Sequence, residues 1–351
     1  MLPSDITSLK ITPEILRLVS KIDEFKGQWL ALGKISRERL TQLKKTATIE
    51  SVGSSTRIEG AKLSDREVEE LLAGLKIESF QSRDEEEVAG YAAAMDLIFE
   101  SWEQLKITEN HIKQLHHVLL QYSSKDKRHR GDYKTLPNHV AAFDADGKQI
   151  GIVFETSEPF DTPSHMAELI DWIESGEKDE QLHPLLLTGI FIVRFLAIHP
   201  FQDGNGRISR ILTTLLLIRH GYNHIPYASL ERIIEDNKEL YYKALRATQA
   251  SFNAEKADWQ PWLLFFLRSL LRHAEFLKKK LLKEDQNILN QLPPITVQIL
   301  NLFDTLDKIT VRETSELTGI NRNTVKSSLS RLVTLGKIKQ HGRGRSVYYT
   351  L

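Results

Sequence analysis

Residues 199–210 read HPFQDGNGRISR, and the rest of the chain can be interpreted from this run. The preceding residues, 185–198, are almost all apolar and predict a buried helix, and the apolar run 211–218 predicts a second one. The sequence therefore predicts a short loop between two core helices, and the end of this loop opens the second helix.

The loop carries residue types that suit a polyphosphate. The first turn of a helix leaves backbone N–H groups unpaired and attracts anions, and Gly204 and Gly206 permit positive φ and the close approach of a ligand. Arg207 and Arg210 lie three residues apart on one helical face, where forked guanidinium groups suit phosphate oxygens. Asp203 supplies a hard oxygen ligand of the kind that Mg²⁺ uses alongside phosphates.

His199, at the start of the loop, can accept a proton near neutral pH. A base, a metal ligand and an anion site in one loop indicate phosphoryl or nucleotidyl transfer. No other stretch of the sequence has the pattern of a Walker A loop or a Rossmann fingerprint. The pattern HPFxDGNGRxxR resembles the complete signature of the Fic family, whose members mostly transfer AMP from ATP to protein hydroxyl groups.

The resemblance implies a role for each part of the loop. His199 would deprotonate a Ser, Thr or Tyr hydroxyl of the target, which attacks the α-phosphorus of ATP, and Asp203 would hold Mg²⁺ between the α- and β-phosphates. Arg207 would contact the β-phosphate and Arg210 the γ-phosphate. A family branch that transfers phosphate has a bulkier or basic pattern in place of Gly204, so this glycine favours AMP transfer. The implied nucleotide site of the loop comprises Gly204, Asn205, Gly206, Arg207, Ile208, Ser209 and Arg210.

A second motif lies upstream, where residues 54–60 read SSTRIEG, a polar helix end with a glycine stop. The spacing of Ser55, Glu59 and Gly60 is similar to the inhibitory-helix motif of the family, in which the glutamate pairs with the second arginine of the signature, here Arg210. A carboxylate there would compete with the γ-phosphate, so the resemblance implies autoinhibition within one chain. The same glutamate is implied to position a water in relatives that also remove AMP, so a bifunctional enzyme is an alternative.

A hairpin is predicted between these motifs. Residues 131–134, GDYK, resemble the start of the family's flap, and residues 138–143 and 148–155 predict two short strands around the turn DADG at 144–147. The resemblance implies that the flap holds a target segment by strand addition; the alternative is a structural hairpin without a partner. Residues 154–159 lack the double proline of many relatives, which bears on the register of the target.

Phe154, Glu155 and Tyr241 complete the predicted nucleotide site. Residues 237–245 resemble the family's Tyr-Tyr-x-x-Leu segment, in which an aromatic ring can lie against the adenine. Tyr241 is chosen over Tyr242, although a packing role explains either tyrosine equally well.

Residues 295–351 predict a separate small domain after the linker Pro293-Pro294. Three helical runs and two strand-like runs around GRGR at 342–345 look like a winged helix-turn-helix, with residues 321–332 as the recognition helix. Basic residues outnumber acidic ones from residue 308 onward, which suits the phosphate backbone of DNA. Winged helices attached to enzymes also bind protein, so both kinds of partner stay open.

Composition sets the frame for these motifs. The 351 residues carry no net charge, 41% hydrophobic residues and no cysteine, which excludes disulfides and thiolate metal sites. The N-terminus lacks the pattern of a signal peptide and no apolar run has membrane-spanning length, so a cytoplasmic protein without a membrane partner is expected. The predicted fold is mainly α, with a helical region 1–110 (inhibitory helix near 45–60), a Fic-type core 111–270 with its β-hairpin flap, a helix and linker 271–294, and a winged helix 295–351.

The sequence thus predicts an auto-inhibited protein adenylyltransferase that uses ATP and Mg²⁺ and modifies a hydroxyl group of a target protein or of itself. Dimerisation is a family habit that the sequence does not display. The alternative from another class is a nucleotide-sensing, DNA-binding regulator. His199 favours the enzyme, because a sensor could bind ATP without that base.

Overall fold

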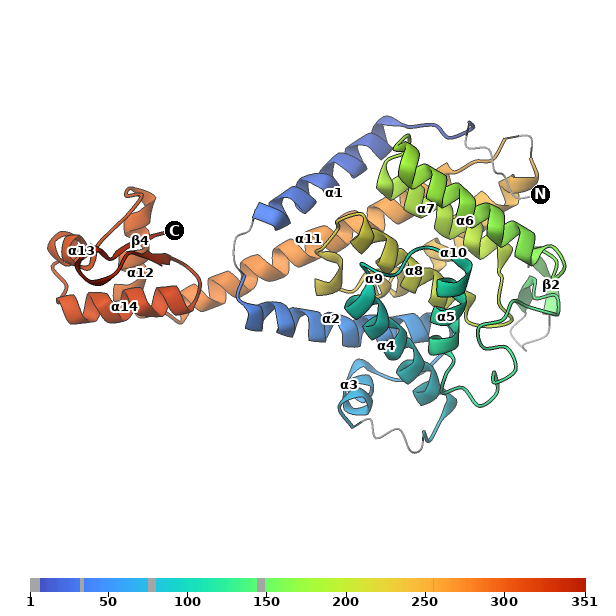
Figure 1. The fold of residues 1–351 in the computed structure, drawn as a ribbon, viewed down its shortest axis with the longest axis horizontal. Coiled ribbons are helices and arrows are strands. Elements are labelled where there is room, and N and C mark those ends of the chain that lie inside the picture. Colours follow the sequence, from blue (N-terminus) through green and yellow to red (C-terminus); the bar gives the residue numbers. More distant parts are fainter. Residues whose placement is uncertain (1–6, 32–34, 75–79, 144–148, 255) are drawn as a thin grey trace. The chain divides into compact units, whose positions relative to one another are not determined.

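The computed structural model describes residues 7–31, 35–74, 80–143, 149–254 and 256–351 (Figure 1). This described part is mainly α-helical and separates into two compact units, the first of Met1–Trp29 and Leu43–Glu275 and the second of Leu30–Gln42 and Phe276–Leu351. These units are defined by contacts between residues and do not test the domain boundaries expected from the sequence, which stay predictions. No helix of the described residues is both long and apolar enough to cross a membrane.

Two helices form the centre of the first unit, as the two apolar runs predict. They are α7 (Pro184–Ile198) and α8 (Asn205–Arg219), which pack against each other, and every residue from 185 to 198 is buried. Removing this many aliphatic side chains from water is the main stabilising contribution to the unit. The surrounding helices are α4 (Arg83–Ser101), α5 (Glu109–Leu119), α6 (Thr162–Asp179), α9 (Leu230–Glu235), α10 (Lys238–Ala250) and α11 (Gln260–Asn290).

The N-terminal helices are α1 (Pro13–Ala31), α2 (Arg37–Ile58) and α3 (Asp65–Gly74). α2 ends in a Schellman turn, in which Gly60 N–H donates to Arg57 O and Ala61 N–H donates to Thr56 O, both at 3.1 Å. Gly60 has φ 111°, a left-handed value that favours glycine. Ser64 and Glu67 then cap α3 reciprocally.

The predicted hairpin is present. β1 (Val140–Phe143) pairs antiparallel with β2 (Gln149–Phe154), and Val140 lies opposite Phe154. The predicted turn at 144–147 lies outside the described residues.

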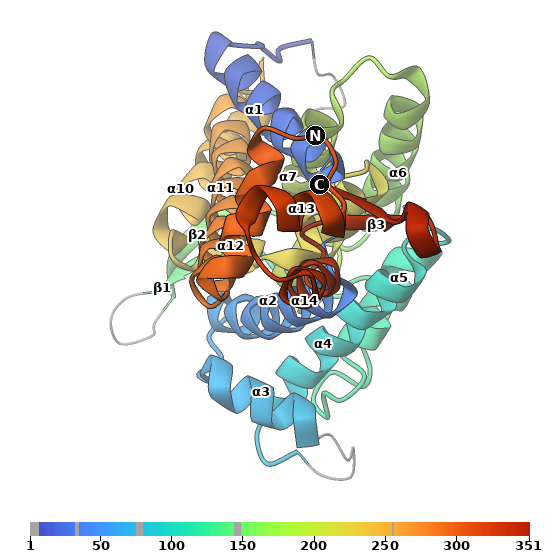
Figure 2. The same cartoon turned by 90° about the vertical axis from the view of Figure 1, so that its left-hand side faces the viewer.

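The second unit has its own core, made of Ile299, Phe303, Ile309, Val325, Leu329, Leu332, Ile338 and Tyr349 with neighbouring apolar residues. Its C-terminal elements are α12 (Pro294–Asn301), α13 (Val311–Thr318), α14 (Arg322–Thr334) and the hairpin of β3 (Lys339–His341) and β4 (Tyr348–Thr350) (Figure 2). A capping box of Thr310 and Glu313 opens α13, and Asn321 caps α14. The assignment of these elements as a winged helix stays a prediction.

Candidate active site

The loop between α7 and α8 is held through its backbone. His199 ends α7 with φ 54°, a left-handed conformation that costs a non-glycine residue about 1–3 kcal/mol and needs support from its surroundings. Lys134 and Asn138 supply that support, because between them they donate to all four carbonyl oxygens of residues 198–201, at 2.6–3.3 Å. The segment that leads into the flap therefore fixes the orientation of His199.

The surroundings of His199 make it a neutral base. A carbonyl oxygen can only accept, so the contact of 3.3 Å between Nδ1 and Leu196 O places the proton on Nδ1 and leaves the Nε2 lone pair to accept another proton. Burial lowers the pKa of His199 to about 4, and nearby Lys134 acts in the same direction, while the bond to Leu196 O opposes them. The imidazole is therefore neutral at pH 7.

The N-terminus of α8 faces a cavity of about 340 Å³. Gly204, the N-cap, has φ 81°, and no described side chain caps the helix, so its first N–H groups are available to an anion. Gly204, Asn205 and Gly206 line the cavity together with His199 and Asp203. The Asn205 side chain itself is occupied inside the loop, since it accepts from Phe201 N–H at 2.9 Å and donates to Phe201 O at 2.6 Å.

Arg207 belongs to a charged cluster beside this N-terminus. Its guanidinium contacts Glu87 Oε2 at 3.0 Å and Asp203 Oδ1 at 3.1 Å, and Arg83 contacts the same two carboxylates at 2.7 and 3.3 Å. Burial alone would raise the pKa of Asp203, but Arg207, the Gly204 N–H and Arg83 lower it, so the carboxylate stays ionised. Arg83 and Glu87 were not among the residues predicted for the site.

Arg210 has partners on α2. It donates to Ser55 Oγ at 2.7 Å, to Ser55 O at 3.0 Å and to Glu59 Oε1 at 2.8 Å. Burial alone would lower the pKa of Arg210, but the negative charge of Glu59 raises it. A Cβ atom added to Gly206 would collide with Glu59 Oε1, so the missing side chain of this glycine makes the room that the carboxylate occupies.

His116 is a further support of the loop that was not among the residues predicted for the site. Its ring stacks on Phe201 with centroids 3.8 Å apart, Nε2–H donates to Asp203 O at 3.0 Å, and Nδ1 accepts from Gly131 N–H at 3.0 Å. Burial lowers its pKa to about 4. The neutral ring therefore joins the loop to the residues that precede the flap.

The other predicted nucleotide contacts divide into two groups. Phe154 and Tyr241 line the cavity, although Tyr241 is only 3% exposed and its ring contacts Trp262 and Phe265. Tyr242, which was not chosen from the sequence, lines the cavity as well. Ile208 and Ser209 are buried and Glu155 is exposed, and none of these three lines the cavity. The structure thus brings Glu59, His199, Asp203 and the three residues 204–206 to one cavity.

The fold and the site define a helical domain in which an uncapped helix N-terminus faces a cavity and a β-hairpin is present. Residues 106–217 match the Fic/DOC family. The chain is 28% identical over 251 residues to the protein adenylyltransferase Fic of Drosophila grimshawi, a match that covers 71% of this chain and 46% of that protein. The chain therefore spans about half the length of the curated relatives it matches.

Solved structures support the same fold. The chain is similar to a Fic family protein from Desulfovibrio desulfuricans G20, with a TM-score of 0.62 and 24% identity over 98% of this chain and 97% of that one. It is also similar to a Fic domain containing signaling protein from Bacteroides thetaiotaomicron VPI-5482, with a TM-score of 0.59 and 25% identity over 75% of this chain and 95% of that one.

Proposed function

We propose that the protein is a protein adenylyltransferase that moves AMP from ATP to a hydroxyl side chain of a target protein. The observation that carries the proposal is a neutral His199 in the wall of the cavity that the uncapped N-terminus of α8 faces. This arrangement suits a base beside a polyphosphate. The name of the curated relatives, protein adenylyltransferase Fic, supports AMP as the transferred group.

In the proposed step, the target hydroxyl loses its proton to His199 Nε2 as its oxygen forms a bond with the α-phosphorus of ATP. The bond from that phosphorus to the oxygen that bridges the α- and β-phosphates breaks, and pyrophosphate leaves. The N–H groups at the start of α8 and the guanidinium of Arg207 would stabilise negative charge on the phosphates. Phosphate anions beside His199 would also raise its pKa from about 4 and make it a better proton acceptor.

Asp203 fits the requirement of Mg²⁺ for an ionised oxygen ligand at the cavity. No group of three or more His, Cys, Asp or Glu residues in the described part could hold a metal ion alone, so we expect Mg²⁺ to arrive with the nucleotide. Bound to Asp203 and phosphate oxygens, it would neutralise phosphate charge.

We further propose that Glu59 keeps this enzyme inhibited. Its carboxylate bonds Arg210 at 2.8 Å and lies where a side chain on Gly206 would be, directly at the start of α8. A γ-phosphate that approaches Arg210 would meet this negative charge, so ATP would bind in an unproductive position. Ser55, which accepts two hydrogen bonds from Arg210, aligns the guanidinium with Glu59.

The test compares wild type, Glu59→Gly and His199→Ala with ATP that is labelled on either the α- or the γ-phosphate. We expect α-label on protein, including the enzyme itself, to rise in Glu59→Gly and to be lost in Glu59→Gly with His199→Ala. Transfer of γ-label would make the protein a kinase-like relative instead. If neither label is transferred while ATP still binds, the nucleotide-sensing regulator is the better description. Loss of α-label from a pre-modified protein on adding wild type would support the bifunctional alternative.

The second unit supports a role in binding a partner. α14 buries Val325, Leu329 and Leu332 and exposes Arg322 and Lys326, so it presents cations on the side away from its core. We propose DNA as the partner of this winged-helix candidate, because exposed cations on a recognition helix suit phosphate contacts. Duplex binding that weakens steeply with salt and is reduced by Arg322→Gln would support this, and binding to protein alone would refute it.

A further inference from the structure

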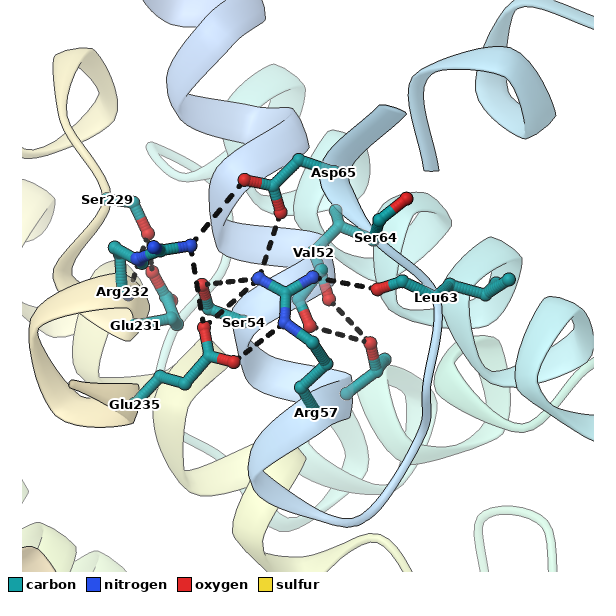
Figure 3. A network of polar contacts seen from close by, with 12 residues as sticks. Val52, Ser54, Arg57, Leu63, Ser64, Asp65, Ser229, Glu231, Arg232 and Glu235 are labelled. Atoms are coloured by element: carbon teal, nitrogen blue, oxygen red, sulfur yellow. Dashed lines mark hydrogen bonds and ion pairs between the residues drawn. The ribbon is translucent and has the colours of Figure 1, made fainter. Parts of the chain in front are cut away.

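The last turn of α2 is fixed from two sides. On one side Glu59 and Ser55 contact Arg210 of α8. On the other side lies the cluster in Figure 3, which centres on Arg57, two residues before Glu59. The proposed reaction does not involve this second cluster, so a role other than catalysis has to explain it.

Arg57 joins three other segments to the end of α2. Its Nε and Nη2 form a fork on the two carboxylate oxygens of Glu235, at 2.7 and 3.0 Å, and Nη2 also contacts Asp65 Oδ1 at 2.9 Å (Figure 3). Nη1 donates to Leu63 O at 2.9 Å. Glu235 ends α9, Asp65 begins α3, and Leu63 lies in the connection between α2 and α3. One guanidinium therefore ties together the segments that surround the last turn of α2.

The Arg57 cluster contains a forked ion pair that lies mostly buried near the surface of the protein. The side chains of Arg57 and Glu235 are only 17% and 22% exposed, and a forked guanidinium–carboxylate pair is stronger than an ordinary surface pair. The hydrogen bond to Glu235 raises the pKa of Arg57, although burial opposes it. A Cβ atom on Gly53 would press against both Arg57 and Asp65, so the helix leaves room for this pair.

Backbone hydrogen bonds fix Arg57 and Glu59 relative to each other, so a shift of Arg57 also moves Glu59. Arg57 O accepts from Gly60 N–H and Thr56 O accepts from Glu59 N–H at 3.0 Å, so the Schellman turn holds residues 56–60 as one unit. If Arg57 loses its partners, this turn loses the ties that Arg57 makes to α3 and α9, while Ile58 stays buried in the core and Ser55 and Glu59 still contact Arg210. The side chain of Glu59 is 30% exposed, so its carboxylate can be hydrated when it leaves Arg210.

We infer that Arg57 is a positioning residue that, through Glu235 and Asp65, holds Glu59 on Arg210 and so sets how strongly the enzyme is inhibited. The inference rests on the proposed function, in which Glu59 blocks productive binding of ATP. It predicts that weakening the Arg57 cluster activates the enzyme, whereas weakening an ordinary structural contact lowers activity or leaves it unchanged.

The test measures transfer of α-label in Arg57→Gln, Arg57→Lys and Glu235→Gln, with Arg66→Gln as the matched control. Arg66 pairs with Glu70 on the exposed face of α3, so its loss removes a nearby ion pair without touching α2. We expect Arg57→Gln and Glu235→Gln to raise transfer about five- to tenfold, since they weaken charge-assisted hydrogen bonds. Arg57→Lys keeps the positive charge but loses the forked pair of hydrogen bonds, so transfer of α-label should rise less in this variant. Glu235→Gln retains the side-chain volume and serves if Arg57→Gln does not fold.

Two further readouts separate positioning from a general loss of structure. Adding Arg57→Gln to Glu59→Gly should give no further rise, because the residue that Arg57 positions is then absent. The affinity for ATP relative to ADP should rise in Arg57→Gln as it does in Glu59→Gly, because both free Arg210 for the third phosphate.

The outcomes distinguish this inference from the function on which it rests. If Glu59→Gly is active while folded Arg57→Gln and Glu235→Gln stay at the wild-type rate, the positioning role is wrong and the proposed function stands. The positioning role is also wrong if the two substitutions add to Glu59→Gly. If Glu59→Gly itself transfers nothing, the proposed function has failed, and the ratio of ATP to ADP affinity still reports whether Arg57 controls Arg210.

Discussion

Arg207 and Arg210 lie within one turn of α8, but their carboxylate partners differ in exposure to solvent and in the number of other contacts they make. Arg207 pairs with Glu87, which is 10% exposed and is also bonded by Arg83. Its second partner, Asp203, lies in the loop directly before α8. Glu59, the partner of Arg210, is 30% exposed and belongs to the end of another helix. Arg207 is therefore enclosed by its carboxylate partners, whereas Arg210 pairs with a carboxylate side chain that has more access to solvent.

The largest effect should come from removing each arginine in turn. Arg207→Ala removes a buried cation from Glu87, which is buried, and from Asp203, which is 36% exposed, and leaves them with the more exposed Arg83; this should lower the free energy of unfolding by about 3–5 kcal/mol. Arg210→Ala should cost less, about 1–3 kcal/mol, because Glu59 can turn to water. Urea unfolding of both variants measures the difference. Equal losses would remove the distinction between the two sites.

Acid should destabilise the surroundings of Arg207, because the neutral His116 ring donates a hydrogen bond to the backbone of Asp203, a partner of Arg207. The folded-state pKa values of His116 and His199, about 4, lie below the usual 6.5, so the unfolded chain takes up protons first as the pH falls. Stability should therefore be full above pH 6.5 and decline toward pH 4, by at most about 3 kcal/mol for each histidine.

Unfolding measured at pH 7.5 and pH 5 tests this dependence. His224, whose pKa burial lowers to about 2, packs edge-on against Phe25 away from the loop. His224→Phe should therefore reduce the loss on acidification without changing the site. Equal stability at the two pH values would contradict the prediction.

Matched substitutions of the two carboxylates should change the rate in opposite directions. Glu59→Gln weakens the bond to Arg210 and should raise AMP transfer, whereas Glu87→Gln loosens Arg207 and should lower transfer about tenfold. Rates of α-label incorporation at saturating ATP measure both. Two changes of the same sign would mean that the arginines depend on their partners in the same way.

The smallest effect is expected from Arg83→Gln. Arg83 is 52% exposed, and its two partners, Glu87 at 2.7 Å and Asp203 at 3.3 Å, are also held by Arg207, so its loss should change the free energy of unfolding by less than about 1 kcal/mol. Since Arg83 competes with a cation for Asp203, the Mg²⁺ concentration for half-maximal transfer should fall about twofold. A rise in that concentration would show that Arg83 helps to hold the metal.

Much of the site follows from local patterns. The apolar runs around residues 199–210 predicted α7 and α8 because helical runs with so few polar residues are expected to be buried. The two strands of the hairpin were predicted to within two residues at each end. The contact between Glu59 and Arg210 was expected only from the family resemblance, and the structure contains it; its inhibitory role stays a prediction.

The supporting contacts could not be predicted in this way. Arg83 and Asp203 are 120 residues apart, and Arg57 and Glu235 are 178 residues apart. Each residue alone looks like one of many charged positions on a solvated helix, and only the packing of the helices makes them neighbours. His116 likewise lies on an amphipathic helix, where its pattern indicates burial but not the two hydrogen bonds it makes.

The open space beside Gly206 has a consequence for how the protein responds to its ligands. Glu59 fills this space, and under the proposed inhibition it would be a competitor tethered to the same chain, whose effective concentration is set by the geometry of α2 and not by the amount of protein. Dilution cannot relieve such a competitor, and a higher concentration of protein cannot strengthen it. Under that proposal, activity would rise when a free anion binds more tightly or when the tether becomes longer or looser.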